Sequence, residues 1–202
     1  MKLYYAPGAC SLSPHIALRE AGLDFDLEQV DLAAKKTRSG ADYRAINPLG
    51  YVPALQLDDG TVMTEASVIA QYVADATPGA KLAPPAGSRE RYGLQTWLNF
   101  IATEIHKGIG PLWKPTTPDA YKETVKQTLA ARFDYLSEQL GDKPYLTGDR
   151  FTIADGYLFT VLNWTNFLKL DMAKWPKLTA YMARVAARPA VQAALKAEGL
   201  AK

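Results

Sequence analysis

Short apolar runs separated by turn residues dominate the first quarter of the chain. Residues 2–6 are rich in aromatic side chains and end at a Pro-Gly pair, which is typical of a short strand. A stretch with helical apolar spacing follows, which Ser11 or Ser13 can cap and Gly22 can end. Residues 25–32 then alternate as a second strand would. The pattern predicts a β-α-β unit, in which the two strands are parallel.

A second group of elements follows a polar stretch and a proline-rich turn. Residues 54–57 and 61–64 flank an Asp-Asp-Gly sequence, which strongly indicates a β-hairpin. Residues 65–76 have helical apolar spacing. The first ~75 residues therefore predict the order β-α-β-loop-β-β-α.

The rest of the chain reads as helical. Residues 77–88 contain three prolines and two glycines, and we interpret them as a linker between domains. Five helical stretches follow, over 89–108, 119–140, 152–168, 176–187 and 189–198. The second of these can be capped by Thr117 or Asp119, and Thr152 with Asp155 fits a capping box at the start of the third. We expect an α/β domain over 1–80 and an all-helical domain over 88–202.

Composition narrows the class of protein. The 202 residues are 48% hydrophobic and 22% charged, as in an ordinary globular protein. The net charge of +2 is too small to suggest a nucleic-acid partner. No window approaches the ~20 apolar residues of a membrane span, and the N-terminus does not resemble a signal peptide. We expect a cytoplasmic protein with neither a membrane nor a nucleic-acid partner.

Cys10 is the only cysteine, which excludes an intrachain disulfide and a multi-cysteine metal site, so we predict no metal. It follows the first strand and stands at the start of a helix, where unpaired N–H groups favour a thiolate. The same place could stabilise the thiolate of a bound thiol instead. The alternative is that Cys10 is a small buried apolar side chain. Ser13 stands where a redox motif would have its second cysteine, which excludes a dithiol cycle but not a mixed disulfide with an external thiol.

Two further segments could bind an extended peptide with charged ends. A cis bond between Val52 and Pro53 would free the N–H and C=O of Val52 for such a ligand, although trans is the commoner form. Glu65 and Ala66 open a helix, where N–H groups can hold a carboxylate and Glu65 can pair with an ammonium. Plain helix capping is the alternative for that second segment.

His106 is the remaining candidate for chemistry. It lies on the first long helix of the second domain, near Asn99, Thr103 and Glu104, and residues 99, 103 and 106 share a face by i, i+3/i+4 spacing. A lone helical histidine is more often solvated or packed, and the same holds for His15.

Together, four motifs resemble those of glutathione S-transferases, closely those of the bacterial beta class, and the match covers nearly the whole chain. They are the run Tyr4–Ser13, the set Asn47–Pro53 with Leu57–Asp59 and Thr64-Glu65, the run Trp97–Lys107, and Phe151–Asp155. The resemblance implies a thioredoxin-like N-terminal domain followed by a helical bundle, the glutathione S-transferase fold, and a homodimer.

The same resemblance implies the residues of a glutathione site. Val52 would pair its backbone with the cysteinyl unit across a cis Pro53, and Lys35 would bind the glycyl carboxylate. Glu65 and Ala66 would hold the γ-glutamyl end, with Ser67 a weaker candidate; since residue 66 is alanine, only its N–H can bind. The remaining implied residues would close the pocket, some of them from a partner subunit: Asn99, Thr103, Glu104 and His106. Cys10 and His106 would flank the sulfur as catalytic residues.

The expected function is a transferase that activates the glutathione thiol for attack on a hydrophobic electrophile, with glutathione as co-substrate and no other cofactor. Three alternatives stay open: glutathione-dependent thiol–disulfide exchange or peroxidase activity, dehalogenase activity, and a non-catalytic protein that binds apolar ligands.

Overall fold

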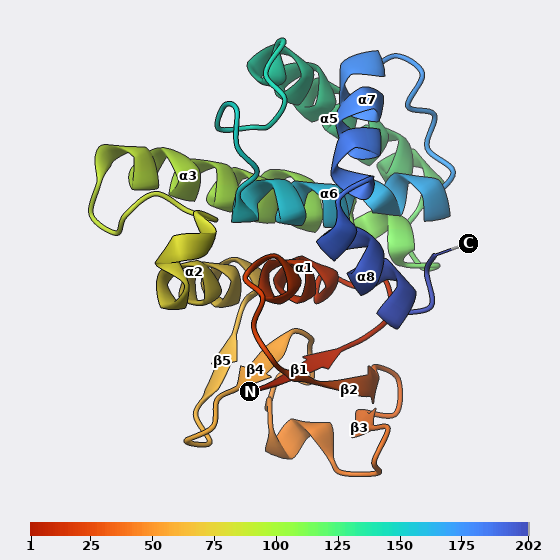
Figure 1. Cartoon of the computed structure of the whole chain (residues 1–202). Coiled ribbons are helices and arrows are strands. Elements are labelled where there is room, and N and C mark those ends of the chain that lie inside the picture. The colour runs from red at the N-terminus through yellow and green to blue at the C-terminus, as the bar shows by residue number, and fades with distance from the viewer. Residues whose placement is uncertain (202) are drawn as a thin grey trace.

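Five strands form one mixed sheet in the order β3-β2-β1-β4-β5 (Figure 1). The computed structural model describes residues 1–201. The strands are β1 Lys2–Tyr5, β2 Asp26–Asp31, β3 Lys36–Thr37, β4 Ala54–Gln56 and β5 Val62–Thr64. β1 and β2 are parallel and are joined through helix α1 (Leu12–Glu20), as the sequence predicted. The hairpin of β4 and β5 is also confirmed, whereas the short edge strand β3 was not predicted.

The sheet is covered on both faces. Helices α1 and α2 (Ala66–Ala76) lie on one face, and a loop containing the 3₁₀ turn Tyr43–Ala45 lies on the other (Figure 1). Tyr43 is fully buried there, and its hydroxyl donates to the carbonyl of Tyr51. The Asn47 amide donates to the same carbonyl. These two bonds hold the turn that leads into Val52.

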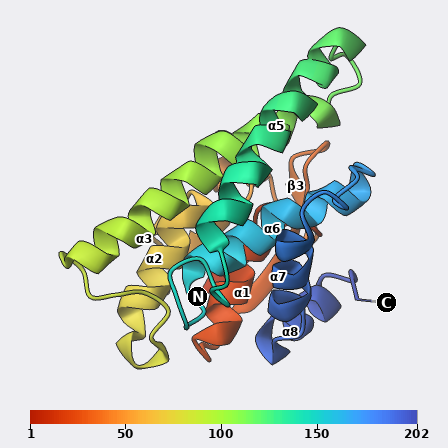
Figure 2. The same ribbon diagram turned by 90° about the horizontal axis from the view of Figure 1, so that it is seen from above.

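Helices make up the remainder (Figures 1 and 2). The longer ones are α3 Arg89–Phe100, α5 Asp119–Leu140, α6 Ile153–Phe167, α7 Pro176–Ala186 and α8 Pro189–Ala197. Shorter segments are the 3₁₀ turns Pro78–Ala80 and Gly110–Trp113 and the single turn α4 Lys107–Ile109. α6 is the most buried of them and contacts α1, α2, α3 and α7, so it is the central helix, as its apolar sequence predicted.

One predicted helix is interrupted. The stretch expected over 89–108 is α-helical only to Phe100, and residues Ile101–His106 then form a π-helix. A π-helix bonds residue i to i+5 and needs more residues per turn, so the faces expected from α-helical spacing are shifted after it.

The side-chain caps predicted for two helices, α1 and α5, are wrong. Ser11 occupies the N-cap position of α1, but its hydroxyl bonds the N–H and C=O of Ala6 instead. The Thr117 hydroxyl donates to Pro111, and no side chain caps α5. The capping box of Thr152 and Asp155 is confirmed at the start of α6.

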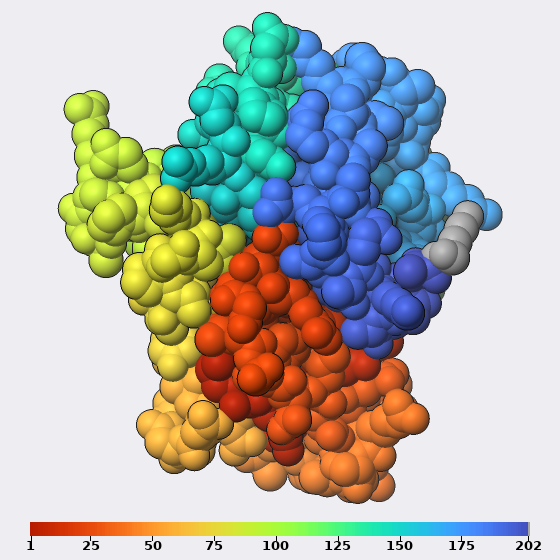
Figure 3. Space-filling model, in the orientation of Figure 1, coloured from red at the N-terminus to blue at the C-terminus, as the bar shows by residue number. Residues whose placement is uncertain are grey.

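The C-terminal helix packs against the N-terminal part of the chain, as the neighbouring red and dark blue surfaces in Figure 3 show. Glu198, directly after α8, is fully buried and accepts hydrogen bonds from Gly8 N–H at 2.9 Å and from His15 Nδ1 at 2.8 Å. Trp164 Nε1 of α6 donates to the Gly8 carbonyl at 2.8 Å. The N–H and the C=O of Gly8, two residues before Cys10, are thus both bonded to side chains of the helical part of the molecule.

The apolar core runs without a break from α1 and α2 into α6. The division into domains over 1–80 and 88–202 therefore stays a proposal, based on the change from sheet to helices and on the proline-rich connection. Within residues 1–201, no helix is both long enough and apolar enough to cross a membrane.

Candidate active site

A cavity of about 350 Å³ lies where the sheet meets the helical part. Its walls come from the loop after β1, the 47–53 turn, the start of α2, the end of the π-helix and α6. The lining residues are Ala9, Cys10, Leu32, Lys35, Asn47, Leu49, Tyr51, Val52, Pro53, Thr64, Glu65, Ala66, His106, Lys107 and Tyr157. Six of the predicted site residues are among them: Cys10, Lys35, Val52, Glu65, Ala66 and His106.

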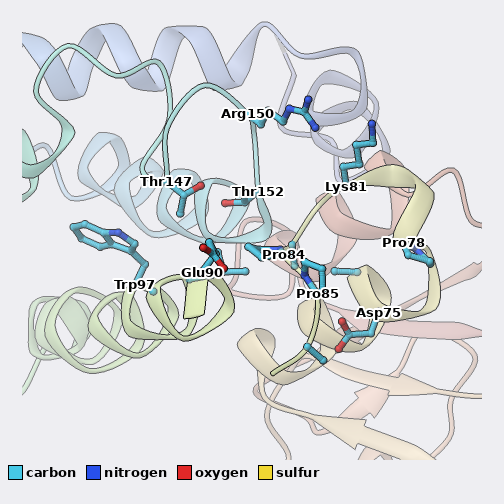
Figure 4. A pocket seen from close by; sticks show the side chains of 15 residues that line it. Asp75, Pro78, Lys81, Pro84, Pro85, Glu90, Trp97, Thr147, Arg150 and Thr152 are labelled. Atoms are coloured by element: carbon cyan, nitrogen blue, oxygen red, sulfur yellow. The ribbon is translucent and has the colours of Figure 1, made fainter. Parts of the chain in front are cut away.

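A larger cavity of about 970 Å³ lies elsewhere, between the 78–86 connection, α3 and the loop before α6 (Figure 4). Trp97 stands at one end of it and Lys81 and Arg150 at the other (Figure 4). It contains neither the cysteine nor either histidine, and no predicted site residue lines it. The smaller cavity is therefore the candidate active site.

Cys10 is half-buried in this cavity, and its Sγ donates to the carbonyl of Val52 at 3.2 Å. Burial raises the pKa of the Cys10 thiol to about 11, although the backbone N–H groups of Cys10 and Ser11 and the nearby Lys107 act in the opposite direction. The helix start lowers the pKa of the Cys10 thiol, as expected, but burial raises it by more, so Cys10 is a protonated thiol in the unliganded protein. Desolvation of the anion outweighs the helix dipole here.

This thiol is expected to react slowly with alkylating agents. With a pKa of about 11 instead of the ordinary 9.0, folded protein at pH 8 should be alkylated by iodoacetamide about 100-fold more slowly than after unfolding in urea. Because Cys10 is the only cysteine, mass spectrometry of the intact chain measures its rate directly. Rapid alkylation of the folded protein at pH 7 would contradict the protonated thiol.

The backbone at Val52 offers a free donor next to Cys10. The Val52–Pro53 bond is cis, the form that the resemblance implied and not the form that base frequency favours. Within the described part of the chain, no acceptor is found for the Val52 N–H. Among residues 1–201, the Val52 carbonyl accepts only from the Cys10 thiol, a weak donor that a stronger one can replace.

The start of α2 forms a second binding element. Glu65 has a left-handed backbone conformation with φ +67°, which costs a non-glycine residue of the order of 1 kcal/mol or more and persists only where the surroundings enforce it. Its carboxylate is exposed and has no ion-pair partner among residues 1–201. The N–H groups of Ala66 and Ser67 likewise have no acceptor in that range. Ser67 does not line the cavity.

Lys35 supplies a cation to the same cavity. It is also left-handed (φ +55°), and its Nζ donates to the carbonyl of Gly50 at 2.9 Å. The Nζ lies 5.5 Å from the centre of the Tyr51 ring, which stabilises the ammonium through a cation–π contact. No carboxylate neutralises Lys35 within the described chain, so it can accept an anionic ligand.

His106 lies at the end of the π-helix, and its Nδ1 is 2.7 Å from the Tyr157 hydroxyl. Its ring packs edge-on against Trp164 at 5.0 Å between centres. Burial, together with the positive charge of Lys107, lowers the pKa of His106 to about 4, so the ring is neutral at physiological pH.

The other three predicted residues lie elsewhere in this chain. Asn99, Thr103 and Glu104 line a separate groove with Arg132 and Tyr135, and Glu104 pairs with Arg132 at 2.6 Å. The π-helix is the reason, because it removes His106 from the face that carries residues 99 and 103. These three side chains do not close the cavity of their own subunit.

Sequence reasoning missed two important members of the site. Tyr157 lies on the very apolar α6 and read as a core residue, although a tyrosine in such a helix needs a partner for its hydroxyl. Tyr51 lies beside Lys35 on the 47–53 turn, where the two prolines indicated a backbone role and gave no signal for the tyrosine side chain.

Comparisons with known proteins agree with this geometry. The family models for the N-terminal and C-terminal domains of glutathione S-transferase match residues 8–76 and 100–189. The chain belongs to the glutathione S-transferase family, which makes it a transferase, and its structural neighbours place it in the bacterial beta class.

Three relatives illustrate the similarity. The chain is 53% identical to glutathione S-transferase GstA of Escherichia coli O157:H7, over 99% of this chain and 100% of that protein. It superposes on a sphingomonad glutathione S-transferase complexed with glutathione with a TM-score of 0.95 and 47% identity, covering 100% of both chains. The beta-class glutathione S-transferase of Sphingomonas chungbukensis gives the same TM-score, 0.95, and the same identity, 47%, over 99% of this chain and 100% of that one.

Proposed function

We propose that the cavity binds glutathione in an extended form along Val52 and activates its thiol for attack on hydrophobic electrophiles. One observation carries the proposal: a single cavity joins a free backbone donor, an unpaired helix start, an unneutralised lysine and a thiol. Glutathione is a tripeptide with two carboxylates, one ammonium and one thiol, and each of these groups has a counterpart there. The sphingomonad relative was solved with this ligand.

The charged ends of the tripeptide fix its direction. The N–H of Ala66 and the positive end of α2 hold the γ-glutamyl carboxylate, while Glu65 pairs with the ammonium. Lys35 exchanges the Gly50 carbonyl for the glycyl carboxylate. The cysteinyl unit between them then pairs with both backbone groups of Val52.

This pairing sets the chemistry. When the cysteinyl N–H of glutathione takes the Val52 carbonyl, the S–H of Cys10 loses that acceptor and donates to the glutathione sulfur. The donation stabilises the glutathione thiolate, whose proton passes to water. The thiolate forms a bond to the electrophilic carbon as the leaving group, such as halide, departs with its electron pair.

The second substrate meets an aromatic surface next to His106. Trp164 packs on His106, and the half-exposed Trp113 packs edge-on against Trp164 at 6.2 Å between ring centres. Phe167, at the end of α6, is also exposed. Large aromatic side chains that remain exposed beside a cavity favour apolar ligands.

A homodimer would complete the site. Two exposed tyrosines lie near these residues. Tyr92 is on α3, as is Asn99, and Tyr135 is on α5, as is Arg132, which forms the ion pair with Glu104. If this face covers the cavity of a second copy, Asn99, Thr103 and Glu104 reach the γ-glutamyl end from the partner subunit. The exposed apolar area supports this arrangement.

Calorimetry with reduced glutathione tests the proposal. We expect micromolar to millimolar binding by the wild type, and Glu65→Gln should weaken it by about 10-fold, because a charge-assisted bond to the ammonium is lost. Glu138→Gln, a change at an exposed carboxylate of α5, should bind as the wild type does. Absence of binding to the wild type would refute the function.

A rival function, thiol–disulfide exchange, receives less support because the Cys10 thiol is protonated. Thiol–disulfide exchange requires Cys10 itself to attack as a thiolate, and burial raises its pKa to about 11. Turnover of a generic aryl halide with no glutathione adduct on Cys10 distinguishes the transferase from the exchanger, and turnover of any kind excludes a mere ligand carrier.

A further inference from the structure

The two histidines of the chain have contrasting hydrogen-bond partners. His106 Nδ1 is 2.7 Å from the hydroxyl of Tyr157. His15 Nδ1 is 2.8 Å from a carboxylate oxygen of Glu198. A hydroxyl can donate or accept, whereas a carboxylate oxygen accepts from the ring N–H. The proton positions on the two rings therefore need separate arguments.

The Tyr157 hydroxyl carries one hydrogen, which needs an acceptor. Tyr157 is 3% exposed, and His106 Nδ1 is its only hydrogen-bond partner in the described part of the chain. If Nδ1 carried the ring proton, the hydroxyl hydrogen would have no acceptor in a buried position, which is costly. The hydroxyl therefore donates and Nδ1 accepts. A neutral ring with Nδ1 as acceptor carries its proton on Nε2.

The second ring nitrogen of His106, Nε2, is not buried. No partner for Nε2 exists among the described residues, and it is not one of the buried orphans there, which are Ser13 Oγ and Arg91 Nε. His106 lines the cavity that also holds Cys10. An Nε2–H on this ring is therefore available to a ligand bound in that cavity.

Burial, with smaller contributions from nearby charges, keeps both groups neutral. Burial raises the pKa of Tyr157, with further contributions from Cys10 and Glu65, so its hydroxyl retains its hydrogen. Burial and the neighbouring Lys107 lower the pKa of His106 to about 4. The groups around the ring are Tyr157 and Trp164 of α6, Lys107 of its own helix, and Cys10, Lys35 and Glu65 across the cavity.

We infer that Tyr157 is a positioning residue, which holds His106 in the Nε2–H tautomer so that the imidazole donates a hydrogen bond to the sulfur of glutathione. His106 acts in this role as a neutral donor and not as a base that removes the thiol proton. The inference rests on the proposed function, because the acceptor is the sulfur bound there. It assigns to Tyr157 a role in the reaction without contact to the reacting atoms.

His15 provides an internal control with the opposite tautomer. Its Nδ1 faces Glu198, and Arg19 Nε donates toward its Nε2 at 3.5 Å. Because the guanidinium can only donate, His15 Nε2 accepts and Nδ1 carries the proton. The two rings should differ in any measurement that reports proton position.

Nitrogen NMR of protein labelled with ¹⁵N-histidine tests the tautomers. With only two histidines, the wild type at pH 7 should show the proton on Nε2 of His106 and on Nδ1 of His15. In Tyr157→Phe the His106 signals should move toward an average of both tautomers, while those of His15 stay unchanged. Tyr121→Phe, an exposed tyrosine on α5, should alter neither ring. A proton on His106 Nδ1 in the wild type, or no response to Tyr157→Phe, would overturn the inference.

Kinetics test whether Tyr157 acts through His106. With glutathione and an aryl halide, Tyr157→Phe should lower kcat/KM by about 10-fold, the value of one hydrogen bond, with little change in the KM for glutathione. His106→Gln keeps a neutral N–H donor and should retain more activity than His106→Phe. Adding Tyr157→Phe to His106→Gln should cost nothing further. An equal loss in both backgrounds would refute the positioning role.

These measurements separate the inference from the function on which it rests. The tautomers are read from the unliganded protein, and glutathione binding is read by calorimetry. Wrong tautomers with normal binding overturn the inference alone. Absence of glutathione binding overturns the proposed function and, with it, the sulfur as acceptor.

Discussion

The Asp155→Ala variant is expected to lose about 4 kcal/mol of its free energy of unfolding, because several buried donors lose their acceptor at once. The Asp155 carboxylate is fully buried and accepts from Leu146 N–H, from the N–H and hydroxyl of Thr152, and from the Tyr181 hydroxyl, all at 2.8–2.9 Å. These bonds join the start of α6 to the preceding loop and to α7. Urea unfolding followed by circular dichroism measures the loss.

Two further variants make this result specific. Asp155→Asn keeps one acceptor oxygen and should fall between the wild type and the alanine variant. Asp142→Ala removes a fully exposed carboxylate that pairs with Lys177 and should change stability by less than about 0.5 kcal/mol. A loss below about 1 kcal/mol for Asp155→Ala would show that the network is not the main support of α6.

Glu198→Ala should impair both stability and turnover. The substitution removes the acceptor of two groups, the buried His15 ring and the partly buried Gly8 N–H, and should lower the free energy of unfolding by about 3 kcal/mol. Because Gly8 lies two residues before Cys10, we also expect kcat/KM with an aryl halide to fall by about 10-fold in the protein that remains folded. Unfolding curves and steady-state kinetics on the same preparation separate the two effects.

Glu198→Gln is the variant to compare with Glu198→Ala. Its amide oxygen can still accept from Gly8, so turnover should recover more than stability does. Glu138→Ala on the exposed face of α5 should leave both unchanged. Normal turnover by Glu198→Ala at a temperature where it is folded would show that the loop before Cys10 keeps its position without this contact.

Much of the architecture could be predicted because local signals agreed with it. Pro7 and Gly8 end β1, Gly22 follows α1, and the Asp-Asp-Gly turn defines the hairpin, so the predicted boundaries lie within a few residues of the observed ones. Asp155 could be recognised as a cap because its three-residue spacing from Thr152 is itself the physical requirement.

Other features depend on contacts that spacing does not encode. The pKa of Cys10 reflects a balance between burial and the helix start, and only the fold determines how much water reaches the sulfur. Ser11 looks like a helix cap, yet the Ala6 backbone competes for its hydroxyl. Glu198 gave no signal at all, since its partners His15 and Gly8 lie more than 180 residues away in the sequence.

The π-helical turn before α4 makes the length of this stretch matter more than most of its side chains. If this stretch relaxed into a regular α-helix at its present length, His106 would turn by roughly 100° around the axis, away from Tyr157, whereas deleting one residue between Ile101 and His106 would allow the α-helix and keep His106 close to its present direction. The orientation of the His106 ring thus depends on the number of residues in the helical segment that leads to it.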